Sequence, residues 1–255
     1  MMIREEMEII SHERIAEDTY RMVLLGDLPA EIKQPGQFVH ILIDQSDSLR
    51  RPISIADADP AKGTLTILYK ILGKGTAALS KMQSGDHLDV LGPGGNGFLI
   101  DSISAERALL VGGGIGVPPL YYLARQLKEK GIEVTTVLGF QHEASVFFEE
   151  EFRELGEVFV TTNDGSYGNK GFVTDILPDL DGRFDTYFSC GPAVMLKAVS
   201  EKLDGYEGYL SIEERLGCGV GACFACVVQA PEGDAKGYRK ICHDGPVFRT
   251  GEVIL

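Results

Sequence analysis

Short apolar runs and turn residues alternate along the first hundred residues. Apolar or alternating segments of strand length lie at residues 8–11, 20–25, 38–43, 64–69 and 87–91. Turn-prone pairs such as Pro35-Gly36 and Lys62-Gly63 separate them. One helix is expected at 76–82. Several short strands at this spacing predict a small antiparallel β-barrel domain over residues 1–101.

After residue 105 the pattern changes to apolar strands that alternate with amphipathic helices. We expect strands at 108–112, 133–139, 158–162 and 186–190, and helices at 118–130, 149–155 and 193–203. Such alternation is typical of a parallel sheet with helices on both faces. It predicts an α/β nucleotide-binding domain over residues 102–208. Residues 209–255 are rich in glycine and cysteine and too few for a core of their own, so they predict a small subdomain organised by a metal.

Composition and charge exclude several classes of protein, such as membrane-spanning and nucleic-acid-binding proteins. With 255 residues, 44% hydrophobic and 24% charged, the chain has the balance of a soluble globular protein. No stretch approaches the roughly 18 apolar residues of a spanning helix, and the start lacks a signal-peptide pattern, so a cytoplasmic location and no membrane are expected. The net charge of −14 repels phosphates, so nucleic acid is not an expected partner.

Four of the five cysteines lie within 25 residues. Cys218, Cys223 and Cys226 form a C-x4-C-x2-C motif, and Cys242 follows after fifteen intervening residues. This spacing suits a plant-type [2Fe-2S] site, and the small residues between the cysteines let backbone N–H groups approach the sulfur atoms. A four-cysteine zinc site remains the alternative, although zinc sites favour paired C-x2-C units and only one is present. Cys190 stands apart at a predicted strand end.

Three segments could bind phosphate groups or a flavin. Arg51 to Ser54 follows an apolar strand, and its arginine can pair with a pyrophosphate while its serine offers a hydroxyl to a flavin ring. Gly73 to Thr76 could present free N–H groups at a helix start. Both segments also fit ordinary turns. Gly112 to Pro119 follows a strand and opens a helix, which is the context of a dinucleotide loop, but it lacks the full G-x-G-x-x-G spacing.

The order of the segments RPIS, GKGT, GPGGNGF, GGGIGVPP and CGPAVM resembles the ferredoxin-reductase-like flavoproteins over residues 1 to about 200. With the cysteine loop added, the whole chain resembles the family of electron-transfer subunits of bacterial dihydroorotate dehydrogenase B. The resemblance implies bound FAD, a [2Fe-2S] cluster and NAD as exchangeable substrate. It also implies an FMN-containing catalytic partner, in a heterotetramer of two plus two, whose electrons reach NAD+ through the cluster and FAD in pyrimidine biosynthesis.

The resemblance also assigns site residues. For FAD they are Arg51, Pro52, Ile53, Ser54, Leu68, Tyr69, Lys70, Gly75 and Thr76. For NAD they are Gly112, Gly113, Gly114, Gly116, Cys190 and Gly191, with Cys190 and Gly191 near the nicotinamide. For the cluster they are Cys218, Cys223, Cys226 and Cys242. Many relatives have an aromatic residue at the position of Ile53, stacked on the flavin, so Tyr69 is the candidate to share that contact. No acid–base catalyst is expected, because hydride and electron transfer require none.

Charge near the second strand of the α/β domain bears on the choice of nucleotide. Residues 139–152 contain no Lys or Arg, and Glu143, Glu149, Glu150 and Glu151 are acidic, which favours NADH over NADPH. Two other functions remain open. One is an NAD(P)H-linked reductase subunit that serves a hydrogenase or ferredoxin partner, and the other is a zinc-stabilised binding protein without redox chemistry. The loop Leu216 to Ala225 is the expected partner surface.

Overall fold

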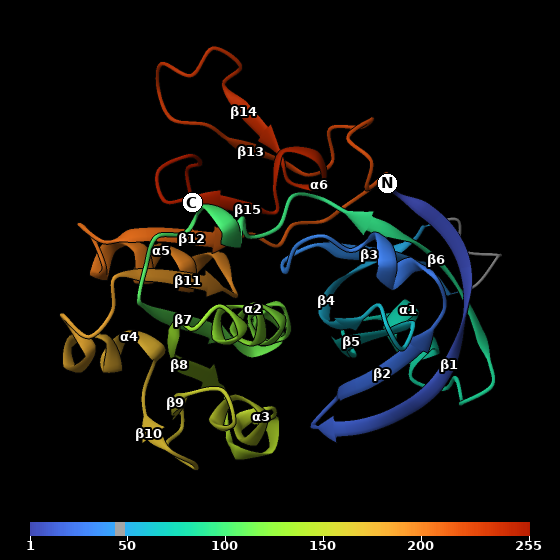
Figure 1. The fold of residues 1–255 in the computed structure, drawn as a ribbon, viewed down its shortest axis with the longest axis horizontal. Coiled ribbons are helices and arrows are strands. Elements are labelled where there is room, and N and C mark those ends of the chain that lie inside the picture. The colour runs from blue at the N-terminus through green and yellow to red at the C-terminus, as the bar shows by residue number, and fades with distance from the viewer. Residues whose placement is uncertain (44–48) are drawn as a thin grey trace.

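The computed structural model describes residues 1–43 and 49–255. Figure 1 shows three parts: a barrel formed by the N-terminal chain, a twisted sheet with helices, and a C-terminal segment that lies above both. No helix within these two ranges is long and apolar enough to cross a membrane.

The N-terminal part is a closed barrel of six antiparallel strands in the order β1-β2-β5-β4-β3-β6. The strands are β1 (Ile3–Ala16), β2 (Thr19–Leu25), β3 (Phe38–Leu42), β4 (Arg51–Asp59), β5 (Thr64–Lys70) and β6 (His87–Gly94), with helix α1 (Lys74–Leu79) between the last two. Alternate residues such as Met7, Ile9 and Met22 fill the interior. The predicted barrel is confirmed.

Three elements of the barrel differ from the predictions, and one of them, β4, had not been expected as a strand. β1 is much longer than the predicted four residues, because it pairs with β2 and β6 and carries charged side chains on its outer face. α1 begins at Lys74 rather than at residue 76, since the Thr76 hydroxyl accepts a hydrogen bond from the Gly73 N–H and fixes the helix start there.

The α/β part contains a seven-stranded sheet in the order β10-β9-β8-β7-β11-β12-β15. Its strands are β7 (Arg107–Gly113), β8 (Glu133–Phe140), β9 (Glu157–Thr162), β10 (Asn169–Lys170), β11 (Thr186–Cys190), β12 (Glu207–Ser211) and β15 (Val247–Arg249), and its helices are α2 (Val117–Glu129), α3 (Glu149–Arg153), α4 (Val173–Ile176) and α5 (Ala193–Lys202). All neighbours are parallel except β12 and β15. The fold class is confirmed, with an antiparallel edge added by the C-terminal strand.

The strand order indicates where a ligand would bind on the sheet. Chain order reverses between the adjacent strands β7 and β11, and ligands of open α/β sheets bind outside the carboxyl ends of the strands at such a switch point. Leu120 and Leu123 of α2 pack in one apolar cluster, and Leu196 and Val199 of α5 pack in another. Two covered faces explain why these strands are apolar runs without alternation.

The C-terminal segment forms a small hairpin and then returns to the sheet. It contains β13 (Val227–Gln229), β14 (Tyr238–Lys240) and α6 (Ile241–Asp244). In the other two parts of the chain, short 3-10 helices span Leu28–Glu31, Ile100–Ser102, Gly114–Gly116, Glu143–Ser145 and Leu177–Leu180. The predicted boundary after residue 208 falls inside β12, and β15 belongs to the sheet. We therefore keep the three-part division as a proposal, with its second boundary nearer the end of β12.

Candidate functional site

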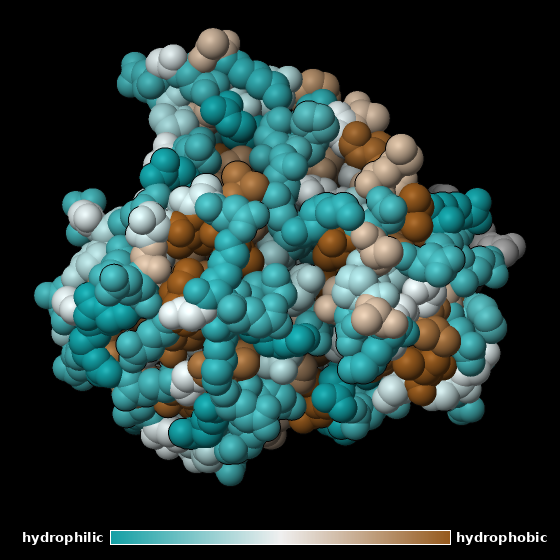
Figure 2. Space-filling model, in the orientation of Figure 1, coloured by the Kyte–Doolittle hydropathy of each residue, from teal (hydrophilic) through white to brown (hydrophobic). Residues whose placement is uncertain are grey.

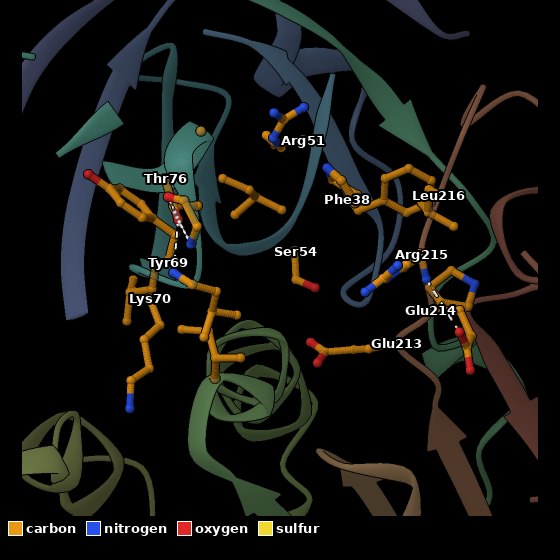
Figure 3. A pocket seen from close by; sticks show the side chains of 18 of the residues that line it. Phe38, Arg51, Ser54, Tyr69, Lys70, Thr76, Glu213, Glu214, Arg215 and Leu216 are labelled. Carbon is orange, nitrogen blue, oxygen red and sulfur yellow. Dashed lines mark hydrogen bonds between the residues drawn. The ribbon is translucent and has the colours of Figure 1, made fainter. Parts of the chain in front are cut away.

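One cavity of about 550 Å³ opens between the barrel, the sheet and the C-terminal segment, and we call it the barrel cavity (Figure 3). All nine residues predicted to hold FAD line it: Arg51, Pro52, Ile53, Ser54, Leu68, Tyr69, Lys70, Gly75 and Thr76. They come from β4, from the neighbouring strand β5 and from the turn into α1. The fold thus brings two separate sequence motifs to one wall.

Cationic side chains line the barrel cavity. A β-carbon on Gly75 would lie 2.4 Å from Nε of Arg51, so the guanidinium rests directly on this glycine. Lys70 and Lys74 line the same cavity. An arginine fork over a glycine turn suits a pyrophosphate. The Thr76 hydroxyl accepts a 2.9 Å hydrogen bond from the Leu72 N–H, so its main role is to close the turn.

The opposite wall was missed by the sequence analysis. Residues 211–216, directly after β12, line the barrel cavity. In Figure 3 the Glu213 carboxylate and the Ser54 hydroxyl point into the same space from different walls. Glu213 is exposed to the open cavity, and the protein atoms around it partly desolvate its carboxyl group, which raises the pKa of that group. No motif marks this segment in the sequence.

Tyr69 does not turn its hydroxyl into the cavity. The hydroxyl lies 2.8 Å from Nε2 of His12 on β1, and the Tyr20 ring stacks on Tyr69 at 5.7 Å between centroids. Ile53 is largely buried and also lines the cavity. Tyr69 therefore contributes a fixed ring to the wall.

A second cavity of about 490 Å³, the sheet cavity, lies at the carboxyl ends of the parallel strands. Gly113, Gly114, the end of β8 and Thr161 line it, and its lining residues include no charged side chain. The Thr161 hydroxyl is buried and has no hydrogen-bond partner within the described ranges. An unpaired polar atom in the wall of an apolar cavity indicates a polar ligand group there.

The other predicted nucleotide residues lie behind this cavity and do not line it. Cys190 is the register partner of Gly112. A β-carbon on Gly116 would lie 2.5 Å from the Cys190 carbonyl, and one on Gly191 would lie 2.6 Å from the Met195 side chain. These small residues therefore let the glycine loop sit tightly against the end of β11.

The glycine loop separates the two cavities. Gly113 and Gly114 face the sheet cavity, whereas Ile115 lines the barrel cavity. Cys190 is fully buried, and burial raises the pKa of its thiol well above the usual value, with the Glu213 carboxylate as a second cause. A buried neutral thiol is inert as a nucleophile. Ligands in the two cavities would meet across Ile115, close to Ser211 and Glu213.

The four clustered cysteines form two pairs. The backbone N–H of Cys223 donates to Sγ of Cys218 at 3.3 Å, and the N–H of Cys218 donates to Sγ of Cys223 at 3.5 Å. Sγ of Cys226 lies 3.4 Å from Sγ of Cys242, which also accepts from the Gly221 N–H at 3.2 Å. Across residues 1–43 and 49–255, no three His, Cys, Asp or Glu side chains surround one metal position.

Electrostatics differ between the two pairs. Burial alone would raise the pKa of Cys218, but hydrogen bonds from backbone N–H groups, Cys223 first, lower the pKa to about 6. Burial and the neighbouring Cys226 thiol raise the pKa of Cys242 to about 12. Two thiol pairs with N–H groups directed at sulfur fit a dinuclear iron-sulfur group, in which each iron takes two thiolates.

Three family models match the chain in order. An oxidoreductase FAD-binding domain matches residues 6–98, an oxidoreductase NAD-binding domain matches 110–201, and the iron-sulfur cluster binding domain of dihydroorotate dehydrogenase B matches 213–254. The predicted cofactors FAD, an iron-sulfur cluster and NAD are thereby confirmed. The sheet cavity and the cysteine pairs lie within these segments, and so does the barrel cavity apart from its lining residues Ser211 and Ile212.

Curated relatives match over the full length. The chain is 53% identical to the dihydroorotate dehydrogenase B (NAD+) electron transfer subunit of Geobacillus kaustophilus, over 100% of both chains. It is 51% identical to that of Shouchella clausii, over 98% of this chain and 97% of the other.

Solved structures share the fold. The structure of an NADH-dependent reduced ferredoxin-NADP oxidoreductase is 35% identical with a TM-score of 0.87, covering 98% of this chain and 90% of the other. The ferredoxin reductase of carbazole 1,9a-dioxygenase has a TM-score of 0.70 at 22% identity, covering 80% and 67%, and supports the fold alone. By its full-length matches, the chain belongs to the family of dihydroorotate dehydrogenase B electron-transfer subunits.

Proposed function

We propose that this chain is the electron-transfer subunit of a cytoplasmic NAD-dependent dihydroorotate dehydrogenase. It links the oxidation of dihydroorotate in an FMN-containing catalytic subunit to the reduction of NAD+ in pyrimidine biosynthesis, in a heterotetramer of two plus two. The observation that carries the proposal is the barrel cavity. Its walls come from the FAD-binding domain, from Ile115 of the NAD-binding domain and from Leu216 and Ile241 beside the cysteines.

Residues of the two cavities and the four clustered cysteines would each have a role in this function. The Arg51 guanidinium would hold the pyrophosphate of FAD, Lys70 would be a further cationic contact in the same cavity, and the Ser54 hydroxyl would bind the ring of FAD. The sheet cavity would hold NAD, and the four cysteines would hold a [2Fe-2S] cluster. When bound, these groups supply hydride transfer and single-electron transfer, which is the chemistry that the protein itself lacks.

The protein contributes position and exclusion of water. Phe38, Ile212 and Leu216 form an apolar side of the barrel cavity, which keeps solvent away from a bound ring. The glycine loop holds the two cavities on opposite sides of one residue, and such positioning accounts for a large share of a transfer rate. An uncharged sheet cavity offers no partner for a 2′-phosphate, which favours NAD over NADP.

The loop Leu216 to Ala225 is the proposed docking surface for the catalytic subunit. Val220 and Phe224 are 47% and 66% exposed beside the cysteines. In Figure 2, some apolar side chains lie at the upper right side of the C-terminal segment, while its hairpin is mostly hydrophilic and further apolar side chains are scattered over the sheet and the barrel. Exposed apolar groups next to a redox centre suit a surface that a partner covers.

Anaerobic purification with analysis of iron, sulfide, zinc and flavin tests the cofactor assignment. We expect two irons, two sulfides and one FAD per chain. Cys223→Ser should lose the iron, whereas Cys190→Ser, a control outside the two cysteine pairs, should retain it. Zinc in place of iron, or iron that survives Cys223→Ser, would overturn the proposal.

Purification with the catalytic subunit tests the partner. The complex should reduce NAD+ when dihydroorotate is added, and the isolated electron-transfer chain should not. An assembly that forms with a hydrogenase or accepts electrons only from ferredoxin would instead establish the alternative reductase function.

A further inference from the structure

His40 on β3 is buried without hydrogen-bond partners. Its side chain is 1% exposed, and neither Nδ1 nor Nε2 has a partner within the described part of the chain. Burial, with the nearby Arg50 charge as a second cause, lowers the pKa of His40 to about 4. The ring is therefore neutral near pH 7 and carries one N–H donor. An unpaired buried donor is destabilising, so its presence in the folded chain calls for a partner that binds there.

The position of His40 on its strand shows which way the ring faces. Val39 and Ile41 point into the barrel core, so the alternate residues Phe38 and His40 point outward. That outer face is buried by the C-terminal segment, because Phe38 belongs to the same apolar cluster as Cys226 and Cys242. The rings of Phe38 and His40 lie 5.5 Å apart.

The cysteine loop lies directly on the His40 ring. A β-carbon on Gly219 would come within 2.2 Å of Cε1 and 2.5 Å of Nδ1 of His40. Gly219 has a φ of +70°, so glycine is favoured there for its backbone conformation as well as for the absence of a side chain. Because Gly219 follows Cys218 in the chain, the unpaired imidazole faces the loop that holds the sulfur ligands.

The other described residues next to His40 do not form a hydrogen bond with its ring. Arg50 donates to the backbone carbonyl of His40 at 3.2 Å and to the carboxylate of Asp89 at 2.8 Å. On the adjacent strands, the register partners of His40 are Pro52 and Leu91, which offer its ring no side-chain hydrogen bond.

We propose that His40 is a positioning residue for the iron-sulfur group, and that its ring N–H donates to a sulfur atom of the cysteine loop or of the group bound there. The inference rests on the proposed function, since it requires the group. A donor at this place stabilises the extra negative charge of the reduced form. The His40 ring also lies between the cysteine loop and Phe38, and Phe38 lines the barrel cavity.

A redox titration of the whole subunit, followed by electron paramagnetic resonance, tests the proposal. His40→Phe should shift the midpoint potential of the cluster to a more negative value, and His40→Asn, which keeps an N–H donor, should restore part of the shift. His87→Phe is the matched control, because His87 is an exposed histidine of the same barrel. The midpoint potential of the cluster in this variant should equal that in the unaltered protein. An unchanged potential in His40→Phe with full iron content would overturn the inference and leave the proposed function intact.

Should His40→Phe fail to fold, a labelling experiment decides the question. The protein is labelled with ¹⁵N-histidine in the variant His243→Gln, which removes the other histidine close to the cysteine loop. The ¹⁵N nuclei of His40 should then couple magnetically to the reduced cluster. Absence of that coupling would overturn the role of His40. A protein without iron would refute the proposed function itself.

Discussion

Tyr69 is held in the wall of the barrel cavity by a hydrogen bond to His12 and by the stacked ring of Tyr20. Nδ1 of His12 lies 2.8 Å from the carbonyl oxygen of Met82, which can only accept. Nδ1 must therefore carry the proton, and Nε2 accepts from the Tyr69 hydroxyl. Burial raises the pKa of Tyr69, so this hydroxyl stays protonated and continues to donate.

Removing the acceptor should destabilise the barrel. His12→Phe leaves the Tyr69 hydroxyl without its partner, and we expect the free energy of unfolding to fall by about 1–3 kcal/mol. Tyr69→Phe alone should cost less, and the double variant should cost less than the sum of the two. Urea unfolding of the four proteins measures the coupling, and strict additivity would show that the pair does not interact.

Single residues were predictable from sequence where a local motif marks them. Arg51, Ser54 and the cysteines stand in short motifs whose residue types suit one chemistry. The fold places Arg51 and Ser54 in the wall of one cavity and Cys226 beside Cys242, and their roles in binding stay predictions. His40 and Glu213 could not be found this way. Each owes its place to the C-terminal segment, which covers the outer face of β3 and forms one wall of the barrel cavity, and no local pattern encodes such a contact.

Among the elements, β4 and the late strands β12 and β15 were not predicted. Pro52 within the Arg51–Asp59 strand favoured a turn, because proline lacks an N–H and is disfavoured inside sheets. β15 is three residues long, and its pairing with β12 joins segments about 40 residues apart. By contrast, the βα alternation around β7 was read correctly, since its strands and helices are long enough to carry their own periodicity.

Asp89 on β6 joins several barrel strands and makes the barrel sensitive to acid. Its carboxylate accepts hydrogen bonds at 2.8 Å from Arg4 on β1 and from Arg50, which also donates to the carbonyl of His40 on β3. Burial alone would raise the pKa of Asp89, but these hydrogen bonds outweigh it and the pKa is lowered. The stabilisation is therefore complete above the unfolded value of about 3.9, and it is lost as pH falls through the lower folded value.

Asp89→Asn should accordingly lower the free energy of unfolding by about 1–3 kcal/mol at pH 7, because Arg50 is left largely buried without its charged partner. The difference from the unaltered protein should shrink below about pH 4. Glu13→Gln is the control, since the exposed pair of Glu13 and Arg21 should contribute less than about 1 kcal/mol. Urea unfolding at pH 7, 4 and 3 measures both, and a difference that does not change with pH would contradict the assignment.

At the scale of the whole molecule, the three parts interlock. Arg125 of α2 pairs with Asp57 of β4 across the contact between sheet and barrel. Asn96, just after β6, donates to the carbonyl of His243 at 2.9 Å, and β15 closes the edge of the sheet. Since each part contributes residues to the barrel cavity, the binding of one cofactor should depend on the integrity of the segment that holds another.

Removal of the metal should therefore loosen the flavin. Ile241 lines the barrel cavity and precedes Cys242, and Leu216 lines it two residues before Cys218. Without metal, only weak contacts hold the cysteine pairs together, and these two walls become free to move. Anaerobic iron chelation should speed the release of FAD severalfold, as measured by the rise of flavin fluorescence. Cys190→Ser before chelation should release FAD at the unaltered rate, because Cys190 does not line the barrel cavity. If chelated protein retained FAD as tightly as untreated protein, the C-terminal segment would hold its place without metal, and the cavity would be a property of the barrel and sheet alone.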